Sequence, residues 1–388
     1  MHQKNITLLY AIAVIVPITF AIRASNNMLA TTVPLLVKYY FNFNSTEVGF
    51  LSALSSMGSL IASGLLNSRL SAITRKRAFI GSSLAYAIIL PTYYLADPLT
   101  IWALSALSGL SLGLIMPNII TTAGLVNDRK SRERILTIYT MALSLSLILG
   151  PLIETAMLSS VTIPWVFLLF EPFGIIVAVL SFLLQFPEEH KNLVKVSVYH
   201  NPGFRVAIYN NTAYSIPFAF IVVFAGIYAR TQFDVSFAVA TGLYSLFYTT
   251  SFISRLILSI RPVERIGVVT AMSILLTAMG LLTATLTKDL LLFIISLLIL
   301  GVPHGLTYPV SLISISRSFR LEERNIANSQ FYAFMTMVTI AVMPLTGLLA
   351  QAVGLKNVFA LLIPSVLFLF ALMRRDIKSM EKIASNVS

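Results

Sequence analysis

Apolar stretches of about twenty residues follow one another along almost the whole of this 388-residue chain, and short polar breaks separate them. A helix of about twenty residues crosses the roughly 30 Å hydrocarbon layer of a bilayer, because each residue adds about 1.5 Å. Only 11% of the residues are charged, far fewer than in a soluble domain. The sequence therefore predicts an all-α membrane protein.

Twelve such stretches can be distinguished, because each break between them carries a turn or charge signal. The predicted spans are 7–38, 46–69, 78–96, 99–124, 135–158, 165–186, 206–229, 235–260, 266–286, 290–315, 325–350 and 357–373. Asn44 and Glu47 have the spacing of a capping box at the start of the second span. The first span shows no convincing cleavage site, so we interpret it as a membrane helix rather than a signal peptide.

The lysines and arginines indicate the orientation of the chain. Lys38, Arg230, Lys288 and Lys356 border one set of loops, and nearly all the others border the opposite set, which includes both termini. Since basic loops stay in the cytoplasm, we expect a multi-pass protein of the cytoplasmic membrane with both termini cytoplasmic. The net charge of +12 is spread over many short loops beside anionic lipids, which argues against nucleic-acid binding.

One unusual spacing occurs once in each half of the chain. GLSLGLIMP at 109–117 and GVPHGLTYP at 301–309 both read glycine, three residues, glycine, three residues, proline. They lie in the fourth and tenth spans, so each belongs to the fourth span of a set of six. We therefore predict two pseudo-symmetric six-helix bundles, 1–186 and 204–388, joined by a polar cytoplasmic linker at 187–203.

Glycines four residues apart let a neighbouring helix come close, and a proline frees a backbone carbonyl and bends the helix. We interpret the repeated motif as a pair of packing seams. Two similar bundles joined by a flexible loop also suit a transporter that rocks about a central site. The residues assigned to this conformational role are Gly109, Gly113, Pro117, Gly301, Gly305 and Pro309.

The chain resembles the major facilitator superfamily of secondary transporters, most clearly from Ser108 to Glu154. This region contains the first glycine motif, the basic loop DRKSRER at 128–134 and the pair Gly150-Pro151. The resemblance implies two six-helix bundles around a central cavity lined by spans one, four, seven and ten. It also implies that Gly150 and Pro151 take part in conformational change.

The loop between the second and third spans matches the family only in part. Gly64, Leu66 and Arg69 fit its motif, and the resemblance implies a gate role for Gly64 and Arg69. Ser68 stands where the family has an aspartate, so the gate pairing that this aspartate would make is in question. In the fifth span, Glu154 follows the proline where proton antiporters of the family have glycine pairs.

Three charged residues lie well inside the predicted membrane spans of the first bundle, away from the span ends: Arg23, Glu154 and Glu171. Placing a charged side chain near the bilayer centre costs about 2.5–3.5 kcal/mol of free energy, so each of the three needs an explanation. We expect Arg23 to pair with Glu154, because the resemblance makes the first and fifth helices neighbours. Such a pair either stabilises the bundle or opens when solute or proton competes for one partner. Glu154 and Glu171 are the candidates for proton coupling, although Glu171 also suits a structural role.

In the second bundle, His304 is a further candidate, since histidine changes charge near neutral pH. It could instead satisfy a carbonyl freed by proline. Arg255, near the cytoplasmic end of its span, is interpreted as reaching the lipid head groups. Amides and phenols complete a predicted solute site of hydrogen-bonding groups. Its residues are Arg23, Asn26, Asn27, Asn118, Asn211, Tyr214, His304 and Tyr308.

The sequence shows no HExxH or phosphate-binding motif and no cysteine. Residues 109–113, GLSLG, match GxSxG but lie inside the predicted span 99–124, whereas a serine elbow needs a strand-to-helix turn, so we expect no enzyme activity, cofactor or metal site. We predict a secondary transporter that moves a small organic solute by alternating access, coupled to protons, and acts as a monomer among membrane lipids. Arg23 and His304 would favour an imported carboxylate. The alternatives are proton-driven efflux of amphipathic compounds or drugs, a membrane receptor that has lost transport, and a channel.

Overall fold

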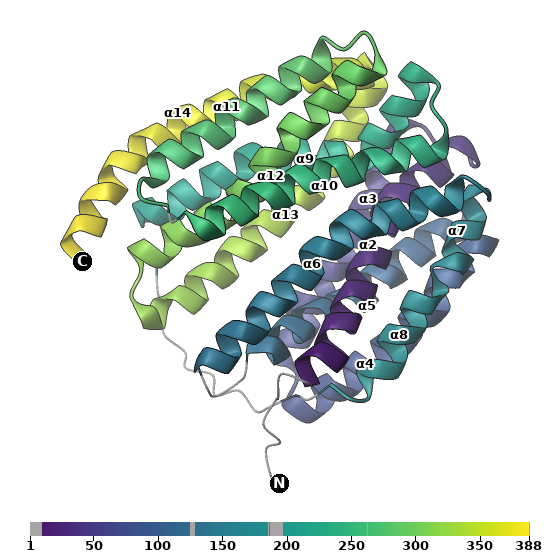
Figure 1. The fold of residues 1–388 in the computed structure, drawn as a ribbon, viewed down its shortest axis with the longest axis horizontal. Coiled ribbons are helices and arrows are strands. Elements are labelled where there is room, and N and C mark those ends of the chain that lie inside the picture. Colours follow the sequence, from purple (N-terminus) through teal and green to yellow (C-terminus); the bar gives the residue numbers. More distant parts are fainter. Residues whose placement is uncertain (1–9, 125–128, 185, 187–196, 262, 388) are drawn as a thin grey trace. The chain divides into compact units, whose positions relative to one another are not determined.

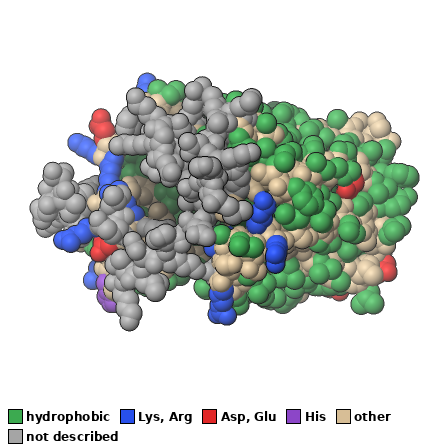
Figure 2. All heavy atoms as spheres, turned by 90° about the horizontal axis from the view of Figure 1, so that it is seen from below, with side chains coloured by type: hydrophobic (Ala, Val, Ile, Leu, Met, Phe, Trp, Pro, Cys, Tyr) green, Lys and Arg blue, Asp and Glu red, His purple; other side chains and the backbone are tan. Residues whose placement is uncertain are grey.

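The computed structural model describes residues 10–124, 129–184, 186, 197–261 and 263–387. All regular structure in this part of the chain is helical. Twelve helical segments are long and apolar enough to cross a membrane, and each overlaps one of the twelve predicted spans. The predicted all-α membrane class is therefore confirmed. Hydrophobic side chains cover much of the face shown in Figure 2, as expected of a surface that meets lipid tails.

Within each half of the chain the helices follow one another closely (Figure 1), and residues 182–201 separate the last helix of the first half from the first helix of the second. The first half contains α2 (Val16–Tyr39), α3 (Ser45–Leu60), α4 (Ala72–Thr92), α5 (Thr100–Gly124), α6 (Arg129–Leu158), α7 (Ile163–Leu169) and α8 (Glu171–Ser181). The second half contains α9 (Pro202–Phe233), α10 (Phe237–Ile260), α11 (Ile266–Thr285), α12 (Leu290–Ser318), α13 (Leu321–Val353) and α14 (Leu355–Val387). The predicted sixth span is divided at Phe170 into α7 and α8, because Pro172 has no amide hydrogen to continue the helical bonds.

Side chains at the helix starts bond to backbone amides that the helices leave unpaired. The predicted capping box is confirmed: the Glu47 amide donates to Asn44 Oδ1 at 3.0 Å, and the Asn44 amide donates to Glu47 Oε2 at 2.8 Å. Before α5, Asp97 Oδ1 accepts from the amides of Leu99 and Thr100. These bonds hold the pKa of the Asp97 carboxyl below its usual value.

Contacts divide the chain into two compact units. Unit 1 contains Met1–Phe43, Phe50–Lys191 and Ser236–Ser245, and unit 2 contains Asn44–Gly49, Asn192–Val235 and Leu246–Ser388. The first turn of α3 thus belongs to unit 2, and the first part of α10 belongs to unit 1. Most of the predicted linker, residues 187–196, lies outside the described residues.

The same pairs of helices pack together in both units. In unit 1, α2 packs against α6 and α8, and α4 packs against α5 and α8. In unit 2, α9 packs against α13 and α14, and α11 packs against α12 and α14. Each of these helices in unit 2 stands six spans after its counterpart in unit 1. The duplication seen in the glycine motif therefore extends to the packing of the helices.

The repeated glycines lie where two backbones touch. A Cβ at Gly109 would overlap the carbonyl of Ser55. In unit 2, a Cβ at Gly305 of α12 would overlap the carbonyl of Ser251 in α10. A Cβ at Gly113 would likewise overlap the carbonyl of Ser59, and a Cβ at Gly301 would overlap the carbonyl of Phe247. The predicted packing seams are confirmed, and only glycine allows this approach.

The other motif residues of the first half differ in their surroundings. Gly150 of α6 faces α2, where a Cβ would lie 3.3 Å from Ala24 Cα. Gly64 is exposed in the π-helical stretch Ile61–Leu66 that follows α3. Arg69 is exposed at the end of the next helical turn, Asn67–Arg69. Gly150 therefore serves helix packing, whereas the gate roles of Gly64 and Arg69 stay predictions.

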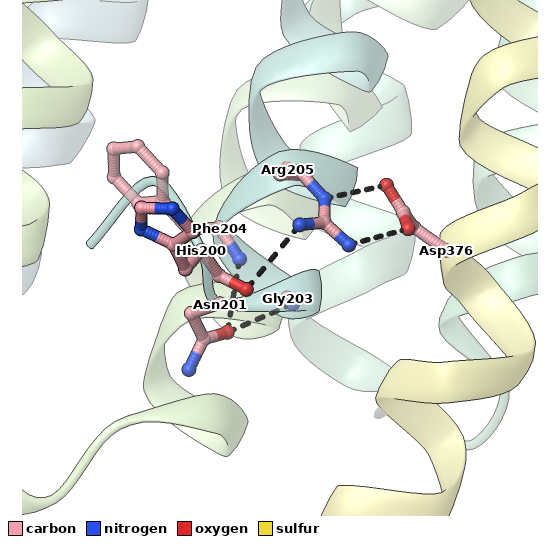
Figure 3. Close-up of polar contacts among 6 residues, drawn as sticks. All are labelled: His200, Asn201, Gly203, Phe204, Arg205 and Asp376. Atoms are coloured by element: carbon pink, nitrogen blue, oxygen red, sulfur yellow. Dashed lines mark hydrogen bonds and ion pairs between the residues drawn. The ribbon is translucent and has the colours of Figure 1, made fainter. Parts of the chain in front are cut away.

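The start of α9 is fixed by polar contacts that the sequence did not predict (Figure 3). Arg205 donates from Nε to Asp376 Oδ2 at 2.8 Å and from Nη2 to Asp376 Oδ1 at 2.7 Å, which joins α9 to α14. Asn201 Oδ1 accepts from the amides of Gly203 and Phe204. The Asn201 side chain also donates to the Ser318 carbonyl at the end of α12. Three helices of unit 2 are thus bonded together at this point.

We expect Gly109→Ala to lower the free energy of unfolding by about 1–3 kcal/mol, because the added methyl would force α3 and α5 apart. Thermal unfolding in detergent would measure the change. Gly81→Ala in α4 is the matched control, since nothing lies within 4 Å of a Cβ there. An equal melting temperature for Gly109→Ala and wild type would contradict the seam.

We expect the ion pair between Arg205 and Asp376 to contribute about 1 kcal/mol to the free energy of unfolding, because it is bidentate but partly exposed. A double-mutant cycle with Arg205→Gln and Asp376→Asn would measure this coupling as a change in the free energy of unfolding. If the two single losses simply add in the double variant, the pair does not stabilise the fold.

Candidate functional site

Glu154 is fully buried in α6 and faces α2. Its Oε2 accepts a hydrogen bond from the Thr31 hydroxyl at 3.2 Å, and its Oε1 accepts one from the Thr32 hydroxyl. Among the described residues, no cation contacts this carboxyl group. Glu154 is therefore a membrane-buried acid whose only polar partners in the described part of the chain are two hydroxyls.

The predicted ion pair between Arg23 and Glu154 is wrong. No hydrogen bond or ion pair joins them in the described part of the chain, and Thr31 lies about 12 Å farther along α2 than Arg23 at about 1.5 Å per residue. Depth counted along each helix does not fix which turns of two neighbouring helices face each other. Arg23 lies half-buried on α2, on the same side as Asn26. Asn27, the next residue, is buried.

Glu171 is half-buried at the break between α7 and α8. Its Oε2 is buried and receives no hydrogen bond from another described residue. Nearby in unit 1, the Tyr86 hydroxyl donates to Ser25 Oγ at 3.0 Å, so that phenol is already engaged. Like Glu154, Glu171 has no cationic partner among the described residues. Unlike Glu154, it receives no hydrogen bond from a described hydroxyl.

Asn118 packs inside unit 1. Its Nδ2 donates to Asn67 Oδ1 at 2.8 Å and to the Leu114 carbonyl at 2.6 Å. The side chain is 1% exposed. The bond to Asn67 joins α5 to the helical turn Asn67–Arg69, and the bond to Leu114 lies within α5. Together they supply a structural reason for an amide at this depth.

In unit 2, His304 of α12 lies among aromatic rings. Its ring centroid is 4.6 Å from that of Phe218, 5.2 Å from Phe247, 5.5 Å from Tyr248 and 5.7 Å from Tyr214. We call these four side chains the aromatic cluster. They come from α9 and α10.

The polar partner of His304 is a hydroxyl rather than a carbonyl. Its Nδ1 lies 2.7 Å from Ser251 Oγ of α10. The alternative that His304 satisfies a carbonyl freed by proline is therefore wrong for Nδ1. Ser251 is also the residue whose backbone meets Gly305, so the glycine seam sets the distance between the imidazole and α10.

Three predicted solute-binding residues of unit 2 have different degrees of exposure. Tyr214 is buried and donates from its hydroxyl to the Leu300 carbonyl at 3.1 Å. Asn211 is also buried and donates to Ser215 Oγ at 3.0 Å. Tyr308 is 42% exposed, and its ring lies 6.1 Å from that of Phe331. Tyr214 and His304 are brought together, whereas Asn211 is bonded within its own helix.

Arg255 of α10 does not reach toward the lipid head groups, which corrects the interpretation drawn from its place in the sequence. Its Nη2 lies 3.5 Å from the His304 carbonyl, which places the guanidinium beside the aromatic cluster. This contact with α12 shows that Arg255 points toward the middle of its span, in line with the general lean of helical side chains toward the helix N-terminus. The sequence showed that Arg255 is a charge inside an apolar stretch, but it did not show in which direction the side chain points.

The two units thus hold two distinct polar sites: Glu154 with Thr31 and Thr32 in unit 1, and His304 with Arg255 in unit 2. Among the residues that the structure describes, no group of three or more histidine or acidic side chains is arranged to hold a metal ion.

A family model described as Major Facilitator Superfamily matches residues 15–301 and 209–385. The chain belongs to the major facilitator superfamily. Membership confirms the resemblance drawn from the glycine and loop motifs. It also agrees with the prediction that this superfamily member is a transporter and not an enzyme.

Solved structures of other superfamily transporters share the fold. A bacterial homolog of the human lysosomal transporter Spinster matches with a TM-score of 0.76 and 14% identity, over 97% of this chain and 99% of that one. A peptide transporter crystallised with sulfate matches with a TM-score of 0.76 and 12% identity, over 95% of both chains. The nucleoside transporter NupG matches with a TM-score of 0.69 and 12% identity, over 93% of this chain and 98% of that one.

These TM-scores show a common fold, and at 12–14% identity the comparison extends to the fold alone. A sequence search of curated proteins gives no significant match.

We expect Asn118→Ala to lower the free energy of unfolding by about 1–3 kcal/mol, because the buried Asn67 Oδ1 loses this donor. The melting temperature in detergent would show the loss. Asn67→Ala should cost a similar amount, and the double variant should lose less than the sum of the two. Full additivity would show that the two amides do not depend on each other.

Proposed function

We propose that this superfamily member is a secondary active transporter that moves a small organic solute across the cytoplasmic membrane in exchange for, or together with, protons. Family membership supports transport by alternating access. The observation that carries the proton coupling is Glu154, a fully buried acid with two hydroxyl partners and no cation among the described residues.

The charged form of Glu154 is unfavourable at this buried position. A carboxylate buried without a cation costs several kcal/mol, and binding a proton removes that cost. The Thr31 and Thr32 hydroxyls can donate to either form, but they do not neutralise a charge. Loss of the proton would therefore favour a conformation in which water or a cation reaches Glu154. Proton binding and conformation would then be linked, as coupled transport requires.

The solute would be held by polar side chains of both halves. On this proposal, Arg23 and Asn26 of α2 contribute from the first half, and Tyr214, His304 and Tyr308 contribute from the second. Residues 1–186 and 204–388 act as the two moving bodies, with 187–203 as their linker and both termini in the cytoplasm. The transporter would work as a monomer in contact with lipids.

A second candidate is proton-driven efflux of amphipathic compounds. The aromatic cluster around His304 favours it, because flat rings bind apolar surfaces without demanding one shape. The two candidates differ in direction. Solute accumulation driven by external acid would support import, and proton-driven extrusion would support efflux.

The proton coupling can be tested with Glu154→Gln in liposomes. A thermal-shift screen of metabolites on the purified protein would first supply a solute. We expect the variant to lose uptake driven by a pH gradient and to keep counterflow, since exchange of solute needs no net proton movement. The wild type should show both activities.

Glu171→Gln would test the second proton candidate in the same assay, and Glu264→Gln, at an exposed position, is the control. Gradient-driven uptake that persists in Glu154→Gln would reject Glu154 as the proton carrier. Gradient-driven uptake that persists in Arg23→Gln at every pH would reject the role proposed for Arg23.

A further inference from the structure

Arg255 is a cation inside a membrane span with no acidic partner among the described residues. It lies in α10, within the span Phe237–Ile260, and is partly buried. Its guanidinium contacts the His304 carbonyl at 3.5 Å from Nη2, which is at the limit of a hydrogen bond. Intramembrane arginines are rare, because each one costs free energy that function or pairing must offset.

The position of the guanidinium argues against a role at the membrane surface. Arg255 stands about 7 Å from the end of α10, at about 1.5 Å per residue, and could extend toward that end. Instead it meets the residue whose imidazole bonds to Ser251, one turn earlier on α10. The side chain therefore turns away from the near end of its helix.

The described residues use little of the hydrogen-bonding capacity of Arg255. Its Nε is buried and has no hydrogen-bond partner in the described part of the chain. A guanidinium has five N–H donors in a planar fork, and one long contact to a carbonyl satisfies little of it. A buried donor without an acceptor costs about 1–3 kcal/mol, so an added acceptor at this fork would be favourable.

The surroundings of Arg255 suit an anion with an apolar body. The guanidinium contacts the His304 carbonyl, and the His304 ring lies 5.7 Å from that of Tyr214 and 5.5 Å from that of Tyr248. The rings of the aromatic cluster provide flat apolar surface next to the guanidinium. A planar carboxylate matches the guanidinium fork with two parallel hydrogen bonds, and this match is stronger than one to a neutral oxygen.

We propose that Arg255 binds the acidic group of an organic anion whose flat apolar part lies against the aromatic cluster. The transported solute of the proposed function is then an aromatic or similarly flat carboxylate. This inference rests on the proposed transport of an organic solute, but it does not depend on proton coupling through Glu154. The same chemistry, a compact anion on an apolar body, also describes an anionic phospholipid, and we assign the site to the soluble anion.

The test is thermal unfolding of the full-length protein in a non-ionic detergent, with benzoate as the probe and neutral benzamide as its matched control. Benzoate should raise the melting temperature of the wild type in a saturable way, and benzamide should not. Arg255→Gln should weaken the apparent affinity for benzoate by about tenfold or more. Arg255→Lys should keep part of it, since the charge remains but the fork is lost.

Three further measurements distinguish binding at Arg255 from binding at another cation and from a purely structural role. Arg261→Gln, just past the end of the same helix and exposed, should respond to benzoate as the wild type does. Lys288→Gln, at an exposed position before the start of α12, should do so as well. Without ligand, Arg255→Gln should melt no lower than the wild type, because it removes an unsatisfied charge rather than an ion pair.

An equal benzoate response in wild type and Arg255→Gln would overturn the proposal. So would a wild type that responds neither to benzoate nor to phenylacetate beyond the matched amides, or one stabilised through Arg255 only by added phosphatidylglycerol. A clear drop in the melting temperature of ligand-free Arg255→Gln would instead assign Arg255 to the fold. None of these results bears on gradient-driven uptake by Glu154→Gln, so the two proposals can fail separately.

Discussion

In the hydrocarbon of a bilayer no water is present to bond with a polar group, and this constraint explains most of the structure. The backbone satisfies itself by forming helices throughout the described chain. Asn118 bonds to Asn67, and Glu154 accepts from two threonines. Glu171 Oε2 and Arg255 Nε are among the buried atoms that have no described partner. In Arg255 the unpaired donor belongs to a cation, which is why we propose that a ligand completes the bonding there.

The glycine seams give both units the same architecture by close backbone contact rather than by side-chain bonding. Gly109 meets Ser55 in unit 1, and Gly305 meets Ser251 in unit 2. Since van der Waals packing is the main attraction between helices in lipid, such contacts contribute strongly to helix association. In unit 2 the seam also has a chemical result, because Ser251 is the hydrogen-bond partner of His304. Packing and site geometry are therefore set by the same pair of helices.

The sequence predicted what depends on distance along a single helix and missed what depends on how two helices face each other. Span lengths, the capping box at Asn44 and the seams follow from local spacing, and all were confirmed. The pairing of Arg23 with Glu154 required the register of α2 against α6, which no local pattern encodes. The bond between Arg205 and Asp376 joins residues 171 positions apart and has no sequence signal. The direction of the Arg255 side chain likewise depends on the neighbouring α12.

The attachment at the start of α9 has a mechanical consequence. Most of α9 is buried within unit 2, and its first turn is bonded to the end of α12 through Asn201 and to α14 through Arg205. A pull on the segment that enters α9 cannot be absorbed by unwinding that turn alone. The force would be transmitted directly to α9, α12 and α14, so a displacement of residues 197–201 would move these three helices together.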